Sequence, residues 1–202
     1  MTHSLTHIPN GAPLRQRGVT MIELMVGVVI LAILLAVAVP SFQSAVASSR
    51  LTTTTNDLVS ALSAARSEAI RRGSRVTVCK SSNGTQCTTA GNWSQGWIVY
   101  TDPIRAGTDA SVDTGEVILV TGAASAAGIV LAGPTGMNDF VSYAADGQPK
   151  LMNGTAQSGR IRVCNTSGAL SNAARARDVD ISTTGRLFTT TPSSVAATCP
   201  LS

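Results

Sequence analysis

The sequence predicts an α+β fold, in which one long N-terminal helix packs on a small antiparallel β-sheet or sandwich domain. Three observations predict it. Residues 19–39 form an almost unbroken apolar run. A stripe of apolar side chains at helical spacing follows that run, and short alternating segments separated by turn residues fill the rest of the chain. The 202 residues are enough for one ordinary domain and an appendage.

The apolar run is long enough to cross a membrane as a helix. It extends roughly 30 Å at about 1.5 Å per residue. The residues that interrupt it are Thr20, Glu23 and Gly27. Residues 1–18 carry Arg15 and Arg17 but no acid, so the positive-inside rule keeps them cytoplasmic and sends the rest of the chain outward.

The helical pattern continues beyond the apolar run. Its stripe consists of Leu51, Leu58, Leu62, Ala65 and Ala69, at intervals of seven, four, three and four. This spacing predicts a helix with one buried face. We expect it to be the second half of one long helix, whose first half is transmembrane. Gly73 is a suitable stop. Pro40 cannot donate a backbone N–H, so we expect a bend or a local break there.

Eight short segments after Gly73 have the alternation and the flanking turn residues of β-strands. They are residues 75–80, 96–101, 116–121, 129–132, 139–144, 160–165, 178–182 and 186–190. Most connections are short, which favours antiparallel pairing. We expect residues 101–116 and 122–128 to be exposed loops.

The four cysteines lie in the part of the chain that is sent outward. An even count outside the cytoplasm favours two disulfides, although the sequence allows three connectivities. Cys79–Cys87 would close a turn-rich hairpin, and Cys164–Cys199 would tie the C-terminal tail to a strand. The spacing does not suit a zinc site.

An enzymatic function has little support in the sequence. Both histidines, His3 and His7, lie in the leading segment. The remainder therefore lacks the residues for Ser-His-Asp or Cys-His catalysis and for histidine-ligated metals. It also lacks a glycine-rich phosphate loop after a strand. We expect no enzyme activity, no cofactor and no metal.

The leading segment allows three interpretations: a secretory signal peptide, a plain membrane anchor, or a processed filament subunit. The basic leader that ends in Gly18, followed by VTMIEL and an apolar helix, resembles the N-terminus of type IV prepilins. The resemblance implies that a prepilin peptidase cleaves between Gly18 and Val19 and methylates Val19. Glu23 matches the acidic fifth residue of that family, and Pro40 matches its helix-bending proline. Val19 departs from the usual phenylalanine or methionine.

The resemblance also divides the chain and gives Glu23 a role. Residues 1–18 would be a cleaved leader, 19–45 a transmembrane and filament-core helix, and 46–202 a periplasmic pilin-like domain anchored to the inner membrane. A lone carboxylate in lipid is costly. In a filament it could meet the N-terminal amine of a neighbour and fix axial register. The alternative is an interfacial acid favoured by the helix dipole.

The rest of the chain resembles the FimT/GspH group of minor pilins and pseudopilins. The matching features are ARSEAI at 65–70, the Cys79–Cys87 hairpin, GWIVY at 96–100 and ISTTGR at 181–186. Membership implies a subunit that takes part in initiation, near the tip, of a type IV pilus or a type II secretion pseudopilus. The implied partners are other minor and major pilins or pseudopilins, the prepilin peptidase and the inner membrane.

An alternative function is a pilus-associated receptor for double-stranded DNA in natural transformation. Arginines can grip phosphates by charge and paired hydrogen bonds. The candidates are Arg160, Arg162, Arg175, Arg177 and Arg186. DNA-uptake members of the group use a C-terminal GRxR motif; here Arg186 matches its first arginine, and Phe188 stands at its second.

A structural explanation competes with that alternative. Arg160 and Arg162 alternate along one strand, as Asp178 and Asp180 do along another, so the charges could pair across a solvent face. The aromatic residues Trp93, Trp97 and Tyr100 are predicted to lie in the core rather than to stack on bases.

Overall fold

The computed structural model describes residues 18–104 and 107–201. The described residues divide into two compact units, the first ending at Pro40 and the second beginning at Ser41. The predicted basic leader, with Arg15, Arg17 and both histidines, lies outside the described residues except for Gly18. Arg105 also lies outside them.

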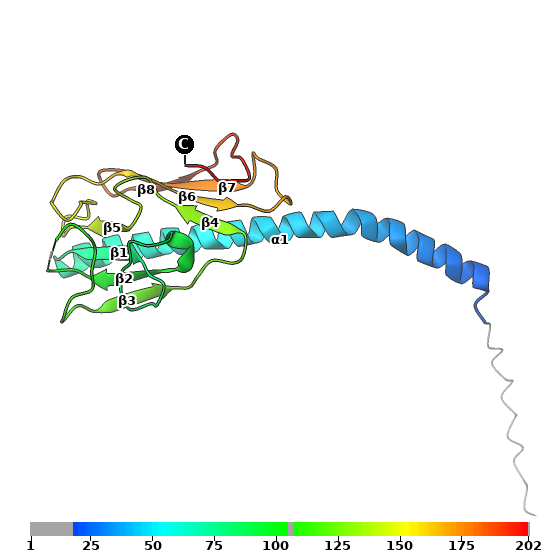
Figure 1. Cartoon of the computed structure of the whole chain (residues 1–202), viewed down its shortest axis with the longest axis horizontal. Helices are drawn as coiled ribbons and strands as arrows, with labels where there is room; N and C mark the ends of the chain where they lie inside the picture. Colours follow the sequence, from blue (N-terminus) through cyan, green and yellow to red (C-terminus); the bar gives the residue numbers. More distant parts are fainter. Residues whose placement is uncertain (1–17, 105–106, 202) are drawn as a thin grey trace, which may run out of the picture. The chain divides into compact units, whose positions relative to one another are not determined.

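The only α-helix of the described residues, α1, extends over Met21–Arg72 (Figure 1). In the first unit its apolar side chains are exposed. By length and composition α1 is able to cross a membrane. The helix is continuous through Pro40, so there is no local break at this residue. Proline removes one backbone hydrogen-bond donor, and the adjoining turns keep their own hydrogen bonds. The bend at Pro40 remains a prediction.

The second unit contains the buried half of α1. The predicted stripe is confirmed, since Leu51, Leu58 and Leu62 and the two alanines that follow them are all fully buried. The helix ends at Arg72 because Gly73 adopts a φ of 62°. The Ser74 N–H reaches the Ala69 carbonyl at 3.3 Å, an arrangement typical of glycine-terminated helices.

All eight predicted strands are present, each with bounds within a few residues of those expected. They are β1 (Val76–Lys80), β2 (Trp97–Thr101), β3 (Ile118–Gly122), β4 (Ile129–Ala132), β5 (Phe140–Tyr143), β6 (Gly159–Asn165), β7 (Ala176–Ile181) and β8 (Leu187–Thr190). They form two antiparallel four-stranded sheets. The first sheet has the order β3-β2-β1-β5, and the second has the order β4-β6-β7-β8. A short 3₁₀ helix, η1 (Trp93–Gln95), was not predicted.

One core joins the buried face of α1 to both sheets. Val78 and Val99 of the first sheet and Ile161 and Val179 of the second belong to the same buried cluster as the helix stripe. The first sheet is also covered on its other face, where Ile98 and its neighbours form a second cluster.

The covering of that second face corrects one expectation. Residues 101–116 were expected to be an exposed loop, but Asp102 is only 2% exposed. Ala110 and Val112 pack on the second cluster. Alternate residues of β2, such as Ile98 and Tyr100, are apolar on the face away from α1, so the loop must fold over them to exclude water.

Candidate functional site

The start of α1 carries the residues expected to be processed. Gly18 and Val19 are exposed and precede the helix, and Thr20 caps it. The Thr20 hydroxyl accepts the Glu23 backbone N–H at 3.3 Å, and the Thr20 carbonyl accepts the Leu24 N–H at 3.2 Å. Thr20 and Glu23 thus have the spacing of a capping box. The first turn of the helix begins only three residues after Gly18.

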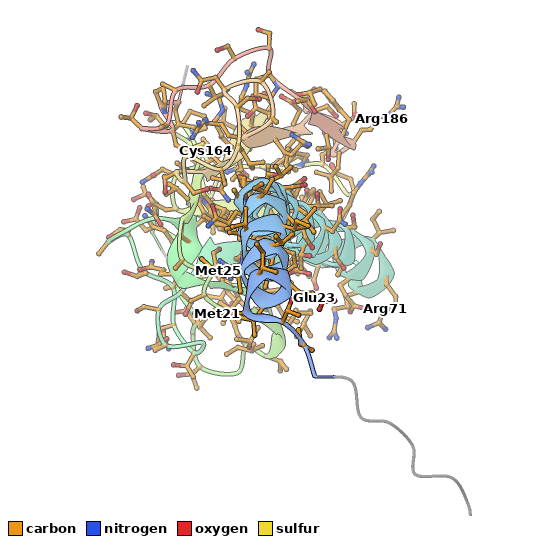
Figure 2. The ribbon with its side chains drawn as sticks, turned by 90° about the vertical axis from the view of Figure 1, so that its right-hand side faces the viewer. Met21, Glu23, Met25, Arg71, Cys164 and Arg186 are labelled. Carbon is orange, nitrogen blue, oxygen red and sulfur yellow. A yellow bond between two sulfur atoms is a disulfide. The ribbon has the colours of Figure 1, made fainter. Side chains whose placement is uncertain are left out.

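This local geometry defines what Glu23 can do. Its carboxylate belongs to the first turn of α1 (Figure 2), where the helix dipole favours negative charge. Cleavage after Gly18 would create a positive amine two residues before the helix. The geometry is compatible with both the register role and the interfacial role of Glu23. Cleavage, methylation and filament register therefore stay predictions.

The predicted disulfide pairing is confirmed. Cys79 bonds to Cys87 across eight residues, with a Cα–Cα distance of 5.6 Å. Cys164 bonds to Cys199 across 35 residues, with a Cα–Cα distance of 5.9 Å. The second bond holds the C-terminal tail, residues 191–201, against β6. Two bridges of this kind are typical of a domain in an oxidising compartment.

The charge pairing between two neighbouring strands is also confirmed. Arg162 of β6 lies opposite Asp178 of β7, and Arg160 lies opposite Asp180. The Arg162 guanidinium donates to both oxygens of Asp178, at 2.7 and 2.8 Å. Its Nη1 also donates to the Pro200 carbonyl at 2.5 Å.

The surroundings of the Arg162–Asp178 pair differ from the prediction. The pairs were expected on a solvent face, but the side chains of Arg162 and Asp178 are only 4% and 2% exposed. The tail covers them, since Pro200 bonds to Arg162 and its neighbour Cys199 is bonded to Cys164. Arg160, with a side chain 46% exposed, remains at the surface.

The remaining arginine candidates are divided in the same way. Arg175 is buried and donates to the backbone carbonyls of Asn165, Ser167 and Leu170. Arg177 is half-buried and donates to two carbonyls of its own segment. Arg186 is exposed and projects from the ribbon in Figure 2. Of the five predicted arginines, Arg160, Arg177 and Arg186 therefore keep exposed surface.

Arg66 lies outside the predicted helix stripe, and the sequence did not predict a role for it. In the structure its Nε donates to the Gly147 carbonyl and its Nη2 to the Thr184 carbonyl, both at 3.1 Å. Gly147 belongs to the turn that follows β5, and Thr184 belongs to the β7–β8 turn. Arg66 thereby fastens a turn of each sheet to α1.

Glycine is required beside that arginine. A Cβ on Gly185 would lie 2.2 Å from the Gly147 carbonyl oxygen and 3.0 Å from Arg66 Nε, and Gly185 has a φ of 77°. Only a residue without a side chain fits there. The packing of Gly185 against Gly147 and Arg66 therefore explains the glycine of the TGR sequence at 184–186.

Lys80 is a second residue that the sequence did not single out. It is fully buried, and its Nζ lies 2.7 Å from the Asp139 carboxylate. It also donates to the Thr89 and Gly91 carbonyls, both at 2.9 Å. These bonds satisfy the buried ammonium and hold the loop after the Cys79–Cys87 bridge. The spacing of the sequence offers no signal for such a lysine.

Asp102 is a further buried ionisable residue. It accepts a hydrogen bond from the Thr77 hydroxyl at 2.5 Å. Burial raises the pKa of Asp102 to about 6, against the lowering effect of Thr77. Burial also raises the pKa of Glu116, in the same loop.

The described residues hold no group of three histidines, cysteines, aspartates or glutamates able to bind a metal ion. The predicted core positions of the aromatic residues are confirmed, because Trp93, Trp97 and Tyr100 are all at most 3% exposed. Trp93 donates its indole N–H to the Met137 carbonyl at 3.0 Å. These rings are not available for stacking on bases.

Comparison with protein families decides the assignment. The family model described as "Type II transport protein GspH" matches residues 54–185, well over half of the chain. The chain belongs to the GspH family. A second model, "Prokaryotic N-terminal methylation motif", matches residues 13–39. Together they make this GspH-family chain a pilin-like subunit of the minor pilin and pseudopilin type, as its sequence predicted.

Solved structures give a more distant likeness to this GspH-family chain. Two crystal forms of the type IV minor pilin FimU of Pseudomonas aeruginosa PAO1 resemble it. The P21 form is 18% identical, the match covers 71% of this chain and 98% of the crystallised chain, and the TM-score is 0.44. The P65 form is 14% identical, covers 73% and 96%, and has a TM-score of 0.42. Among curated proteins none matches.

The GspH match has informative limits. It includes the Cys79–Cys87 bridge, and also Arg66, which bonds a turn of each sheet to α1, and Gly185 beside Arg66. It ends before β8 and the tail that carries Cys199. The tail and Cys199 thus lie outside the matched region, whereas Cys164, the other half of that disulfide, lies inside it.

Proposed function

We propose that this chain is a minor subunit that takes part in initiation, near the tip, of a type IV pilus or a type II secretion pseudopilus. One observation carries the proposal. A single helix supplies an exposed apolar surface in the first unit and a buried stripe in a disulfide-bonded second unit. Such a surface needs lipid or other apolar helices around it.

The start of the helix supports the proposed processing. Gly18 and Val19 lie outside the helix, where a prepilin peptidase could reach the bond between them. Val19 would then carry the methylated amine. We propose that Glu23 meets the amine of a neighbouring subunit in the apolar filament core. The same helix would hold the subunit in the inner membrane before assembly, with the second unit in the periplasm.

The role is structural rather than enzymatic. The proposed partners are other minor and major pilins or pseudopilins, the prepilin peptidase and the inner membrane. The buried ion pairs and disulfides of the second unit stabilise a domain for display on a filament, and none of them contributes a catalytic group.

Two measurements test the proposal. In the wild type, quantitative mass spectrometry of sheared filaments counts the copies of this protein. In a strain that lacks the gene, the number of filaments is compared with that of the wild type. The proposal predicts few copies relative to the major subunit, and a loss of filament number on deletion. Loss of surface pili identifies the type IV machine, and loss of exoprotein secretion identifies the type II machine. Normal pili together with normal secretion would contradict the proposal.

DNA uptake is a second candidate function. The exposed Arg160 and Arg186 and the half-buried Arg177 favour it. Arg162 and Arg175, by contrast, are committed to internal bonds. The test is a gel-shift titration of the full chain in detergent with double-stranded DNA, at low and high salt. A receptor would bind in a salt-dependent way and lose affinity in Arg186→Ala. Binding that is absent at low salt would exclude this role.

A further inference from the structure

The second unit contains a groove of about 540 Å³ between α1 and β3. One side is formed by polar residues of α1, among them Arg50, Thr53 and Asp57. The other side is formed by the end of β3, residues 120–122, and by the small residues 123–126 that follow it. Trp97 also lines the groove.

The groove runs along an open sheet edge. β3 pairs with β2 on one side, and in the described part of the chain no strand pairs with its other side (Figure 1). An edge strand presents unpaired backbone N–H and C=O groups, which form a template for another strand. Val120, on this strand, is 40% exposed. The groove can therefore accept an extended polypeptide.

Two buried polar atoms of groove residues lack partners. They are Trp97 Nε1 and Ser125 Oγ, for which the described residues supply no hydrogen bond. Such atoms are uncommon in folded proteins and call for an explanation. The other indole, Trp93, does have an acceptor, the Met137 carbonyl. Both atoms are buried, so a peptide in the groove would lie beside them rather than bond to them.

The charged residues of the groove are also unpaired. Arg50 and Asp57 are exposed, and within the described ranges neither forms an ion pair. Glu68, farther along α1, is by contrast paired with two arginines. Arg50 and Asp57 lie seven residues apart, or about 10 Å along the helix axis. An acid facing Arg50 and a base facing Asp57 would set the direction of a bound strand.

We propose that this groove binds an extended segment of a partner polypeptide, which adds a strand to β3 and places an acidic side chain at Arg50. The unpaired edge supplies backbone hydrogen bonds, and the opposite charges of α1 select the segment. The inference rests on residues of the second unit alone. It does not depend on the filament role proposed for Glu23.

The test places a photoreactive benzoyl-phenylalanine at Val120 of the full chain, in the cells that make it, and identifies cross-linked peptides by mass spectrometry. The expected result is one defined partner segment that contains an acidic residue. The yield of the adduct should fall at least tenfold in Arg50→Glu. It should return when the acidic residue of the partner segment is changed to arginine in that variant. The same probe at Thr189, on the exposed edge strand β8, is the matched control and should not capture this segment.

Several results would overturn the proposal: no adduct at Val120, an adduct only with lipid or with a second copy of this chain, or an adduct that Arg50→Glu leaves unchanged. Filament number is measured in the same cells, so that the two proposals can fail separately. Missing adducts with normal filaments overturn only the groove. If filaments assemble normally in Glu23→Ala and the adduct at Val120 still forms, only the filament role is overturned.

A second measurement uses a synthetic peptide copy of the cross-linked segment and the full chain in detergent micelles. The two indole N–H resonances in an NMR spectrum belong to Trp93 and Trp97. The groove predicts that the peptide shifts the Trp97 resonance and leaves that of Trp93, already bonded to Met137, in place. Equal shifts of both, or of neither, would contradict binding beside Trp97.

Discussion

Arg162 and Asp178 form a two-pronged ion pair across β6 and β7 that is almost completely shielded from solvent. The C-terminal tail provides the shield, and the Cys164–Cys199 bond holds the tail in place. A pair that the sequence placed on a solvent face is therefore part of the interior. Its energetics differ accordingly, because a buried charge without its partner is costly.

Removing one partner of this pair should destabilise the domain strongly. Asp178→Ala removes the carboxylate that neutralises the buried Arg162 guanidinium, at a cost of about 3–5 kcal/mol. Asp180→Ala is the matched control, because its partner Arg160 is exposed and the cost should stay below about 1 kcal/mol. Urea denaturation of the full chain in detergent, followed by tryptophan fluorescence, measures both. Equal costs would contradict the buried pair.

The two disulfides should differ in their contribution. A bond that closes 35 residues restricts the unfolded chain more than one that closes eight. Loop-closure entropy gives about 4 kcal/mol for the longer loop and about 2–3 kcal/mol for the shorter. Cys199→Ser should therefore cost more than Cys87→Ser in the same denaturation assay, and it should expose the tail to proteases. A tail that stays resistant in Cys199→Ser would show that other contacts hold it.

Gly185 should tolerate no side chain. Gly185→Ala forces a methyl group onto the Gly147 carbonyl at a positive φ, and we expect a loss of more than about 2 kcal/mol. Gly136→Ala is the control, since Gly136 also has a positive φ but no neighbour within 4 Å. It should lose only about 1 kcal/mol. Similar losses in the two variants would mean that the contact with Gly147 and Arg66 is unimportant.

Stability should fall as the pH rises through the titration of Asp102. Burial raises the pKa of Asp102 from its ordinary 3.8 to about 6, so the folded state binds this proton more tightly than the unfolded state. The contribution is complete below about pH 4 and is lost by about pH 6. At about 1.4 kcal/mol per pH unit the loss is at most about 3 kcal/mol.

The variant Asp102→Asn isolates this effect. Its difference in unfolding free energy from the wild type should change between pH 4 and pH 7, because only the wild type titrates at this position. Glu116, whose pKa is raised in the same direction, remains in both proteins. A constant difference across that range would contradict the raised pKa.

The sequence predicted most of the fold because its patterns are local. The stripe from Leu51 to Ala69 and the alternation along β1 and β6 each report which side of an element is buried. The Cys79–Cys87 bridge was expected for the same reason, because its two cysteines flank one turn.

The missed residues depend on partners far away in the sequence. Arg66 bonds to carbonyls 81 and 118 residues away, and no spacing rule foresees such contacts. The covering of Arg162 likewise depends on where the tail folds, which its sequence does not indicate. The groove beside Trp97 arises only when α1 and β3 come together. Packing between distant segments therefore decided what the local patterns could not.

The central claim is that Glu23 places this subunit in a filament, and its direct test is a measurement of assembly in Glu23→Ala. We predict that the variant inserts into the membrane at wild-type levels but reduces filament number or secretion at least tenfold. Glu68→Ala, which removes a half-buried acid from the other half of α1, should leave assembly unchanged. Normal assembly in Glu23→Ala, with the protein at its usual level, would contradict the account.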